Sequence, residues 1–172
     1  MYTGWAGNYP TKVHIILCSE LLSLRILTHM KSTWKAETCD KEAINTILEG
    51  LNDFNFQHVP PAGDIWTPLD CVIRDNDVIV GGILSGIGYW KGLEVRILWV
   101  KENYRNRGIG SFLIKTVEDK AYSKGATTVF LDTFDFQAED FYAKRGYEMI
   151  GQVADFPKKG NRRVYFTKKL DR

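Results

Sequence analysis

The chain has 172 residues, 44% of them hydrophobic, which suits one well-cored domain better than two. Its 23 Lys and Arg residues nearly balance its 21 Asp and Glu residues, which excludes the large basic field of a dedicated nucleic-acid-binding protein. Cys18, Cys39 and Cys71 are scattered without paired spacing. We therefore expect no disulfide framework and no metal site, but free thiols in a cytoplasmic protein.

The first predicted element is an amphipathic helix over residues 13–29. Glu20 and Arg25 interrupt its apolar run before the ~18 apolar residues that a membrane helix needs, and no cleavage site follows, so we expect neither a membrane span nor an export signal. Residues 1–30 are predicted to be an appendage, docked on the domain or in a dimer, or to arise from an upstream start codon. Residues 31–172 are predicted to be a single domain. The helical spacing involves Val13, Ile16, Leu17, Leu21, Leu24 and Leu27.

Residues 32–66 are predicted to form a strand, a helix and a loop. The sequence STWKAET, residues 32–38, favours an opening strand. Asp40 is the predicted N-cap of a helix that has Ile44, Ile47, Leu48 and Leu51 on one face. The following segment, residues 56–66, contains Pro60, Pro61 and Gly63 and is therefore predicted to be a loop.

The next residues are predicted to form antiparallel strands that continue to residue 100. The turn signals are Asp75-Asn76-Asp77 and Lys91-Gly92. After residue 100 the pattern predicts a helix over 108–123, a strand over 127–133, a helix over 135–145 that Gly146 ends, and closing strands over 148–155 and 162–169. The order predicts an α+β fold with a mixed sheet.

The tripeptide Gly-Ile-Gly occurs twice, in two different contexts. Gly86 and Gly88 lie within a strand pattern before a turn, where glycine usually marks a bulge or bend. Gly108 and Gly110 follow a strand and a polar loop and begin an amphipathic helix. Free amides and missing Cβ atoms at a helix start let a phosphate approach the backbone, so the second copy predicts a phosphate site, with a plain helix start as the alternative.

The segment Arg105-Asn106-Arg107-Gly108-Ile109-Gly110 resembles the Arg/Gln-x-x-Gly-x-Gly/Ala loop of the GNAT superfamily of N-acetyltransferases. The later segment AEDFYAKRGYE resembles the family's Ala-x-x-x-Tyr-x-x-x-Gly-Phe/Tyr helix, through Ala138, Tyr142, Gly146 and Tyr147. The likeness covers roughly residues 32–170 and implies a three-layer α/β/α fold around a mostly antiparallel sheet. Asp135 departs from the family pattern, which commonly has Asn there.

The resemblance implies acetyl-CoA as the donor and a primary amine as the acceptor, with direct transfer and no metal. It assigns the pyrophosphate to the helix start and the pantetheine arm to the backbone of the preceding strand. The implied cofactor-binding residues are Leu98, Trp99, Val100, Arg105, Asn106, Arg107, Gly108, Ile109, Gly110, Ser111, Asp135 and Ala138.

Two side chains are candidates for proton transfer. A Lys-like amine titrates near ~10.4, so a base is needed, and Glu94 occupies the position of the basic glutamate in the histone-acetylating branch. The two-residue period of a strand predicts that Glu94 shares a face with Leu98 and Val100. Alternatively, Glu94 pairs with Arg96 or a neighbouring strand, or water acts as the base. Tyr142 matches the family's general acid, although a tyrosine at this spacing is also often core.

The acceptor is the least constrained part of the prediction. Phe56, His58, Trp66, Trp90 and Phe134 are candidates for an aromatic pocket around a small amine, or for core residues. A covalent route through Cys39 or Cys71 has no activating sequence signal. Lys158, Lys159, Arg162 and Arg163 predict a solvated basic face, with a polyanionic acceptor such as an aminoacyl-tRNA as the alternative.

Three hypotheses about function therefore stay open. The first is a small-molecule amine acetyltransferase, without membrane or nucleic-acid partners. The second is an enzyme for protein or tRNA-linked amines, and the third is a silent module that binds acyl-CoA. A homodimer is a candidate assembly, since homodimers are common in the superfamily.

Overall fold

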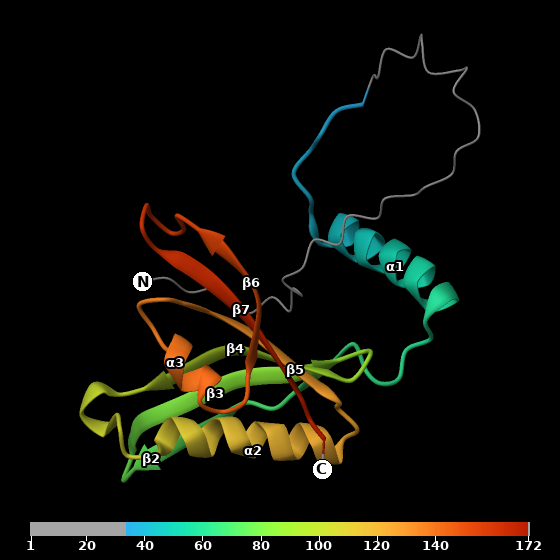
Figure 1. Cartoon of the computed structure of the whole chain (residues 1–172). Coiled ribbons are helices and arrows are strands. Elements are labelled where there is room, and N and C mark those ends of the chain that lie inside the picture. Colours follow the sequence, from blue (N-terminus) through green and yellow to red (C-terminus); the bar gives the residue numbers. More distant parts are fainter. Residues whose placement is uncertain (1–33, 172) are drawn as a thin grey trace. The chain divides into compact units, whose positions relative to one another are not determined.

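The computed structural model describes residues 34–171 (Figure 1). The predictions for residues 1–30 therefore lie outside the described residues. The chain divides into two compact units, residues 1–44 and 45–172, which are described separately. Within 34–171, no helix has both the length and the apolar character needed to cross a membrane.

The predicted opening strand is wrong where the structure describes it. Residues 34–40 have no regular secondary structure and are exposed. A strand needs backbone hydrogen bonds from a neighbouring strand, and the described strands pair with one another rather than with this segment. Helix α1, Lys41–His58, begins as predicted, since Asp40 Oδ1 accepts a hydrogen bond from the Ala43 amide at 2.8 Å. It extends through residues 56–58, which the sequence placed in a loop.

A seven-stranded sheet forms the centre of the second unit and confirms the α+β class. Its order is β1-β3-β4-β5-β7-β6, with β2 also paired to β3, and only β4 and β5 run parallel. The predicted turns are confirmed by positive φ angles at Asn76 (52°) and Lys91 (60°). The strands are β1 Trp66–Pro68, β2 Cys71–Asp75, β3 Val78–Gly88, β4 Gly92–Val100, β5 Thr128–Phe134, β6 Glu148–Ala154 and β7 Arg162–Lys169.

The main core lies between the sheet and helix α2, Ile109–Ser123, which packs along β2, β3 and β4 (Figure 1). The helix approaches closely at Gly81 of β3, where a Cβ atom would lie 2.8 Å from the Ile109 side chain. One apolar cluster joins α2 to four strands. Its buried members include Leu93, Val95, Leu113, Val117, Val129, Leu131, Val164 and Phe166.

Helix α3, Glu139–Ala143, is shorter than the predicted 135–145. The preceding residues form a turn in which Gln137 Oε1 accepts hydrogen bonds from the Thr133 hydroxyl and the Phe134 amide, both at 3.1 Å. This local bonding competes with helix formation. Gly146, with φ of 77°, follows the helix as predicted.

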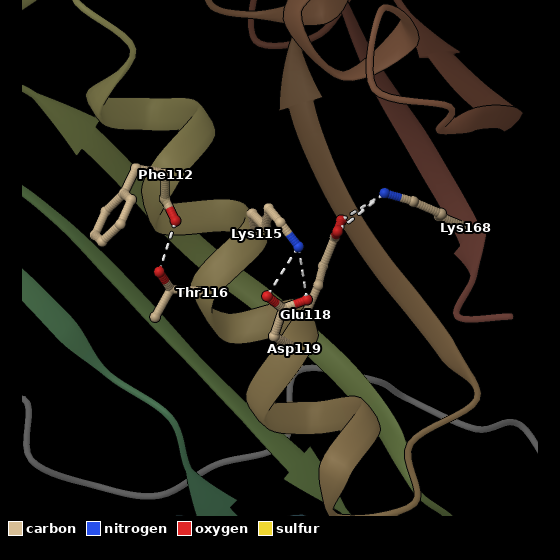
Figure 2. Close-up of polar contacts among 6 residues, drawn as sticks. All are labelled: Phe112, Lys115, Thr116, Glu118, Asp119 and Lys168. Atoms are coloured by element: carbon tan, nitrogen blue, oxygen red, sulfur yellow. Dashed lines mark hydrogen bonds and ion pairs between the residues drawn. The ribbon is translucent and has the colours of Figure 1, made fainter. Parts of the chain in front are cut away.

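A polar network connects α2 to β7 and to the residue after Gly146. The Glu118 carboxylate accepts a hydrogen bond from Tyr147 Oη at 2.7 Å. It also accepts one from Lys168 Nζ at 2.9 Å (Figure 2). Burial and the adjacent Glu118 raise the pKa of the Tyr147 phenol far above its usual value. On the exposed side of the same helix, Lys115 and Asp119 form an ion pair at 2.9 Å. The middle of α2 is therefore fixed by a largely buried polar network as well as by apolar packing.

Candidate active site

The site begins where β4 and β5 stop pairing. The two strands are paired from Gly92 opposite Thr128 to Val95 opposite Leu131, whereas β4 stays paired to β3 as far as Val100. Beyond Val95 the edge of β4 that faces β5 therefore has backbone groups that no neighbouring strand pairs. These groups are available to an extended ligand.

A β-bulge at Arg96 accompanies this separation. Leu84 and Ser85 are consecutive in β3 but pair with Ile97 and Val95, which leaves Arg96 as an extra residue in β4. The bulge reverses the alternation of side chains beyond it.

The predicted common face of Glu94, Leu98 and Val100 is consequently wrong. Leu98 packs against the core below α2, and the Val100 side chain lies near Gly110 of that helix. Glu94 alternates with the core residues Leu93 and Val95 and so lies on the opposite face of the sheet.

A cleft of about 990 Å³ lies between the separated strands, the start of α2 and α3. All the predicted cofactor-binding residues except Arg107 line it, as does the predicted acid Tyr142. The sequence therefore identified half of the residues in the described cleft wall. The described lining residues are Val95, Arg96, Ile97, Leu98, Trp99, Val100, Tyr104, Arg105, Asn106, Gly108, Ile109, Gly110, Ser111, Asp132, Thr133, Asp135, Phe136, Gln137, Ala138, Glu139, Asp140, Phe141, Tyr142 and Arg145.

The start of α2 has the properties of an anion site. Gly108 is the N-cap with φ of 83°, a left-handed conformation that favours glycine. The Phe112 amide donates to the Gly108 carbonyl at 2.9 Å, so the amides of residues 109–111 precede the helical hydrogen-bond ladder. A Cβ atom on Gly110 would lie 3.2 Å from the Phe141 ring, which explains the second glycine. Backbone amides and the helix dipole together fit a diphosphate here.

Three arginines surround this helix start in different ways. Arg105 Nε donates to the Val100 carbonyl at 3.2 Å, and the Arg107 guanidinium lies 5.0 Å from the centre of the Tyr104 ring. Arg145, which the sequence analysis did not select, donates to Ser111 Oγ and, at 2.7 Å, to the Phe141 carbonyl. Its position in the last turn before Gly146 is typical of an ordinary helix C-terminus, so the sequence offered no signal for it.

Tyr142 is both a core residue and a cleft residue, so the two interpretations are compatible. Its side chain is 5% exposed and contacts Phe141, Tyr147 and Phe166. Burial and, to a smaller extent, the charge of Asp132 raise the pKa of its phenol to about 12, and Arg145 opposes the shift. The phenol is therefore protonated at neutral pH, as a general acid requires.

Glu94 and the five predicted acceptor residues are absent from the described cleft lining. Phe56 instead contacts Tyr89 and Trp90. The Trp66 ring packs on Gly86, which explains why the first Gly-Ile-Gly has a glycine there. The Arg96 guanidinium lies 4.9 Å from the centre of the same ring. These side chains lie in separate groups of contacts among the described residues, and the acceptor pocket stays a prediction.

A third aromatic group and the basic segment lie near the cleft. Phe134 contacts Phe136, a lining residue, and Phe156. Arg162 pairs with Glu139 at 2.7 Å and Arg163 with Asp132 at 2.6 Å, so two of the four basic residues are in ion pairs and not on a purely solvated face.

Asp135, the departure from the family pattern, does line the cleft. Its Oδ1 accepts hydrogen bonds from the Phe136 amide at 3.0 Å and from Asn161 Nδ2 at 3.3 Å. The carboxylate thus stabilises the turn after β5 by accepting donors within its own chain.

Comparisons with known proteins agree with this geometry. The sequence profile of the Acetyltransferase (GNAT) family matches residues 32–147. Blasticidin-S acetyltransferase from Streptomyces morookaense is 35% identical over 80 residues, which are 46% of this chain and 58% of that enzyme. A crystal structure of an acetyltransferase from Bacillus cereus is 30% identical, with a TM-score of 0.71 over 79% of this chain and 97% of that one. A structure described as a putative streptothricin acetyltransferase from Bacillus anthracis, in complex with acetyl coenzyme A, shares the fold at 19% identity and a TM-score of 0.53, over 60% of this chain and 63% of that one.

Proposed function

Because the chain belongs to the GNAT acetyltransferase family, we propose that it transfers the acetyl group of acetyl-CoA to a primary amine of a small molecule, by direct attack in a ternary complex. The observation that carries this proposal is the cleft between the separated strands β4 and β5, which has the anion-binding start of α2 and the phenol of Tyr142 in one wall. The name of the blasticidin-S enzyme supports a small amine, although that match covers less than two thirds of the enzyme.

Acetyl-CoA supplies the thioester, and the chain supplies binding and proton transfer. The amides of residues 109–111 receive the diphosphate, and the free edge of β4 at Leu98–Val100 receives the extended arm. The Bacillus anthracis structure of the same fold, which holds acetyl coenzyme A, supports this use of the cleft.

Two side chains manage the protons in this proposal. Tyr142 donates its phenolic proton to the departing thiolate, which its buried and protonated state supports. Glu94 removes the proton of the incoming amine. Because Glu94 lies on the opposite face of the sheet and does not line the described cleft, it acts through water.

The first test is thermal unfolding with and without acetyl-CoA. A ligand at ~100 times its dissociation constant adds about 2.7 kcal/mol, which raises Tm by roughly 5 to 10 °C for a chain of this size. Gly108→Asp should abolish that rise. Gly160→Asp is the matched control, since Gly160 has φ of 88° and open space around it but lies outside the cleft.

The second test is turnover with an amine panel that contains blasticidin S, streptothricin, lysine and a simple alkyl diamine. Release of free CoA that depends on the amine supports the enzyme. Binding of acetyl-CoA without turnover of any amine would contradict the proposed activity.

A further inference from the structure

Asp132 occupies a distinctive position at the point where the sheet opens. Leu131 is the last residue of β5 that pairs with β4, and Asp132 is the next residue along the strand. Val129 and Leu131 are buried in the core below α2, so the alternation of β5 puts Asp132 on the opposite face of the sheet. Asp132 is nevertheless one of the residues that line the cleft. Asp132 therefore lies between the cleft and the face from which a second substrate can approach.

The Asp132 carboxylate is held in a fixed orientation by Arg163. Arg163 Nε donates to Oδ2 at 2.6 Å, and a second guanidinium nitrogen, Nη2, donates to Oδ1 at 2.8 Å. The guanidinium also lies 5.9 Å from the Phe134 ring centre and 5.7 Å from that of Tyr165. Each carboxylate oxygen accepts one N–H from this fork and retains a further lone pair. A third donor from a ligand can therefore bind without breaking the ion pair.

The other carboxylates in the cleft wall are placed differently. Glu139 accepts both of its hydrogen bonds from Arg162, and Asp135 accepts donors within its own turn. Asp140 lies in the first turn of α3. Asp132 is the carboxylate whose charge acts on the Tyr142 phenol. Asp132 and the proposed proton donor Tyr142 line the same cleft, where the reacting ends of the two substrates must meet.

On the basis of the proposed function, we infer that Asp132 binds the ammonium group of the acceptor and that Arg163 is a positioning residue for that carboxylate. The acceptor reaches Asp132 from the sheet face opposite α2, while Tyr142 acts from the α2 side. An anionic group there selects amines that arrive as cations. Glu94, on the same face as Asp132, then takes the proton through water.

The competing explanation is a cross-strand ion pair that only stabilises the sheet. Asp132→Asn and Arg163→Gln break the same ion pair, but only the first removes the carboxylate. Asp119→Asn is the matched control, because it breaks the exposed Lys115–Asp119 pair on a residue outside the cleft lining. The assay uses acetyl-CoA and whichever panel amine the wild-type chain acetylates fastest.

We expect Asp132→Asn to raise the KM for the amine about 30-fold, because the variant loses one charge-assisted hydrogen bond to the ammonium group. The Tm rise caused by acetyl-CoA should stay unchanged. Arg163→Gln should raise this KM only a few-fold, and Asp119→Asn should leave it unaltered. Equal effects of Asp132→Asn and Arg163→Gln would overturn the inference, as would a change within threefold for Asp132→Asn.

Two further outcomes are separable from these. If Asp132→Asn does not fold, Asp132→Glu keeps the charge and displaces it by one methylene, and an unchanged KM for the amine would then overturn the inference. If the wild-type chain binds acetyl-CoA but acetylates no amine, the proposed function fails and the inference with it. If the wild-type chain acetylates an amine but Asp132→Asn leaves the KM for that amine unchanged, only the inference about Asp132 fails and the proposed function stands.

Discussion

The two halves of β4 belong to one strand but have different neighbours. Residues 93–95 are paired on both edges, and Leu93 and Val95 are 0% and 5% exposed. Residues 97–100 are paired only with β3, and Ile97 and Trp99 are 52% and 46% exposed. The first half closes the core, whereas the second leaves backbone groups free beside the cleft. The comparison shows that the cleft lies where β4 is still paired with β3 but no longer with β5.

The largest expected effect concerns chemistry in the open half. Tyr142→Phe should lower kcat about 10³-fold, since it removes a positioned general acid, which is about 4 kcal/mol of barrier. Steady-state kinetics would measure this, and the Tm rise with acetyl-CoA should persist because the ring packing remains. Equal retention of kcat and of acetyl-CoA binding would make Tyr142 a core residue only.

The next largest effect is on the free energy of unfolding, which should differ between substitutions in the two halves of β4. Leu93→Ala in the closed half should lower the free energy of unfolding by about 3 kcal/mol, because it empties a fully buried site. Leu98→Ala in the open half should lower it by about 1 kcal/mol, since Leu98 is only partly buried. Urea denaturation monitored by circular dichroism measures both. Similar losses from the two variants would mean that the halves of β4 do not differ in stability.

The smallest effect separates the anchoring of α2 from the chemistry. Glu118→Gln removes the charge that Tyr147 and Lys168 contact and should lower the free energy of unfolding by about 1 to 2 kcal/mol. Its exposed neighbour provides the control, because Asp119→Asn should change stability by less than about 0.5 kcal/mol. Neither variant should alter kcat for the amine, and a tenfold fall in Glu118→Gln would give the network a catalytic role.

Local patterns predicted α2 and its glycine start, because apolar spacing, capping and missing Cβ atoms are properties of neighbouring residues. The tight turns at Asn76 and Lys91 were confirmed for the same reason. The predicted strand over residues 32–38 failed where the structure describes it, because a strand depends on a partner that its own residues do not specify.

The missed parts of the site depend on contacts between distant residues. Asp132 and Arg163 meet only through the register of β5 with β7, and Arg145 reaches Ser111 across two helices. The predicted aromatic pocket combined residues that the fold distributes among separate groups of contacts. Tyr142 could be predicted because a whole motif surrounds it, whereas no such motif surrounds Asp132.

The bulge at Arg96 has a consequence for anyone who alters this strand. Counting every second residue along β4 puts Glu94 and Leu98 on one face, yet the extra residue Arg96 puts them on opposite faces of the sheet, with Leu98 against the core below α2. Under the proposed function, substitutions at Glu94 test the amine, and substitutions at Leu98 test acetyl-CoA. A mutant library that treats every second residue of β4 as one face would change the selectivity for the amine and for acetyl-CoA together. A library that assigns the faces separately on each side of Arg96 would change them one at a time.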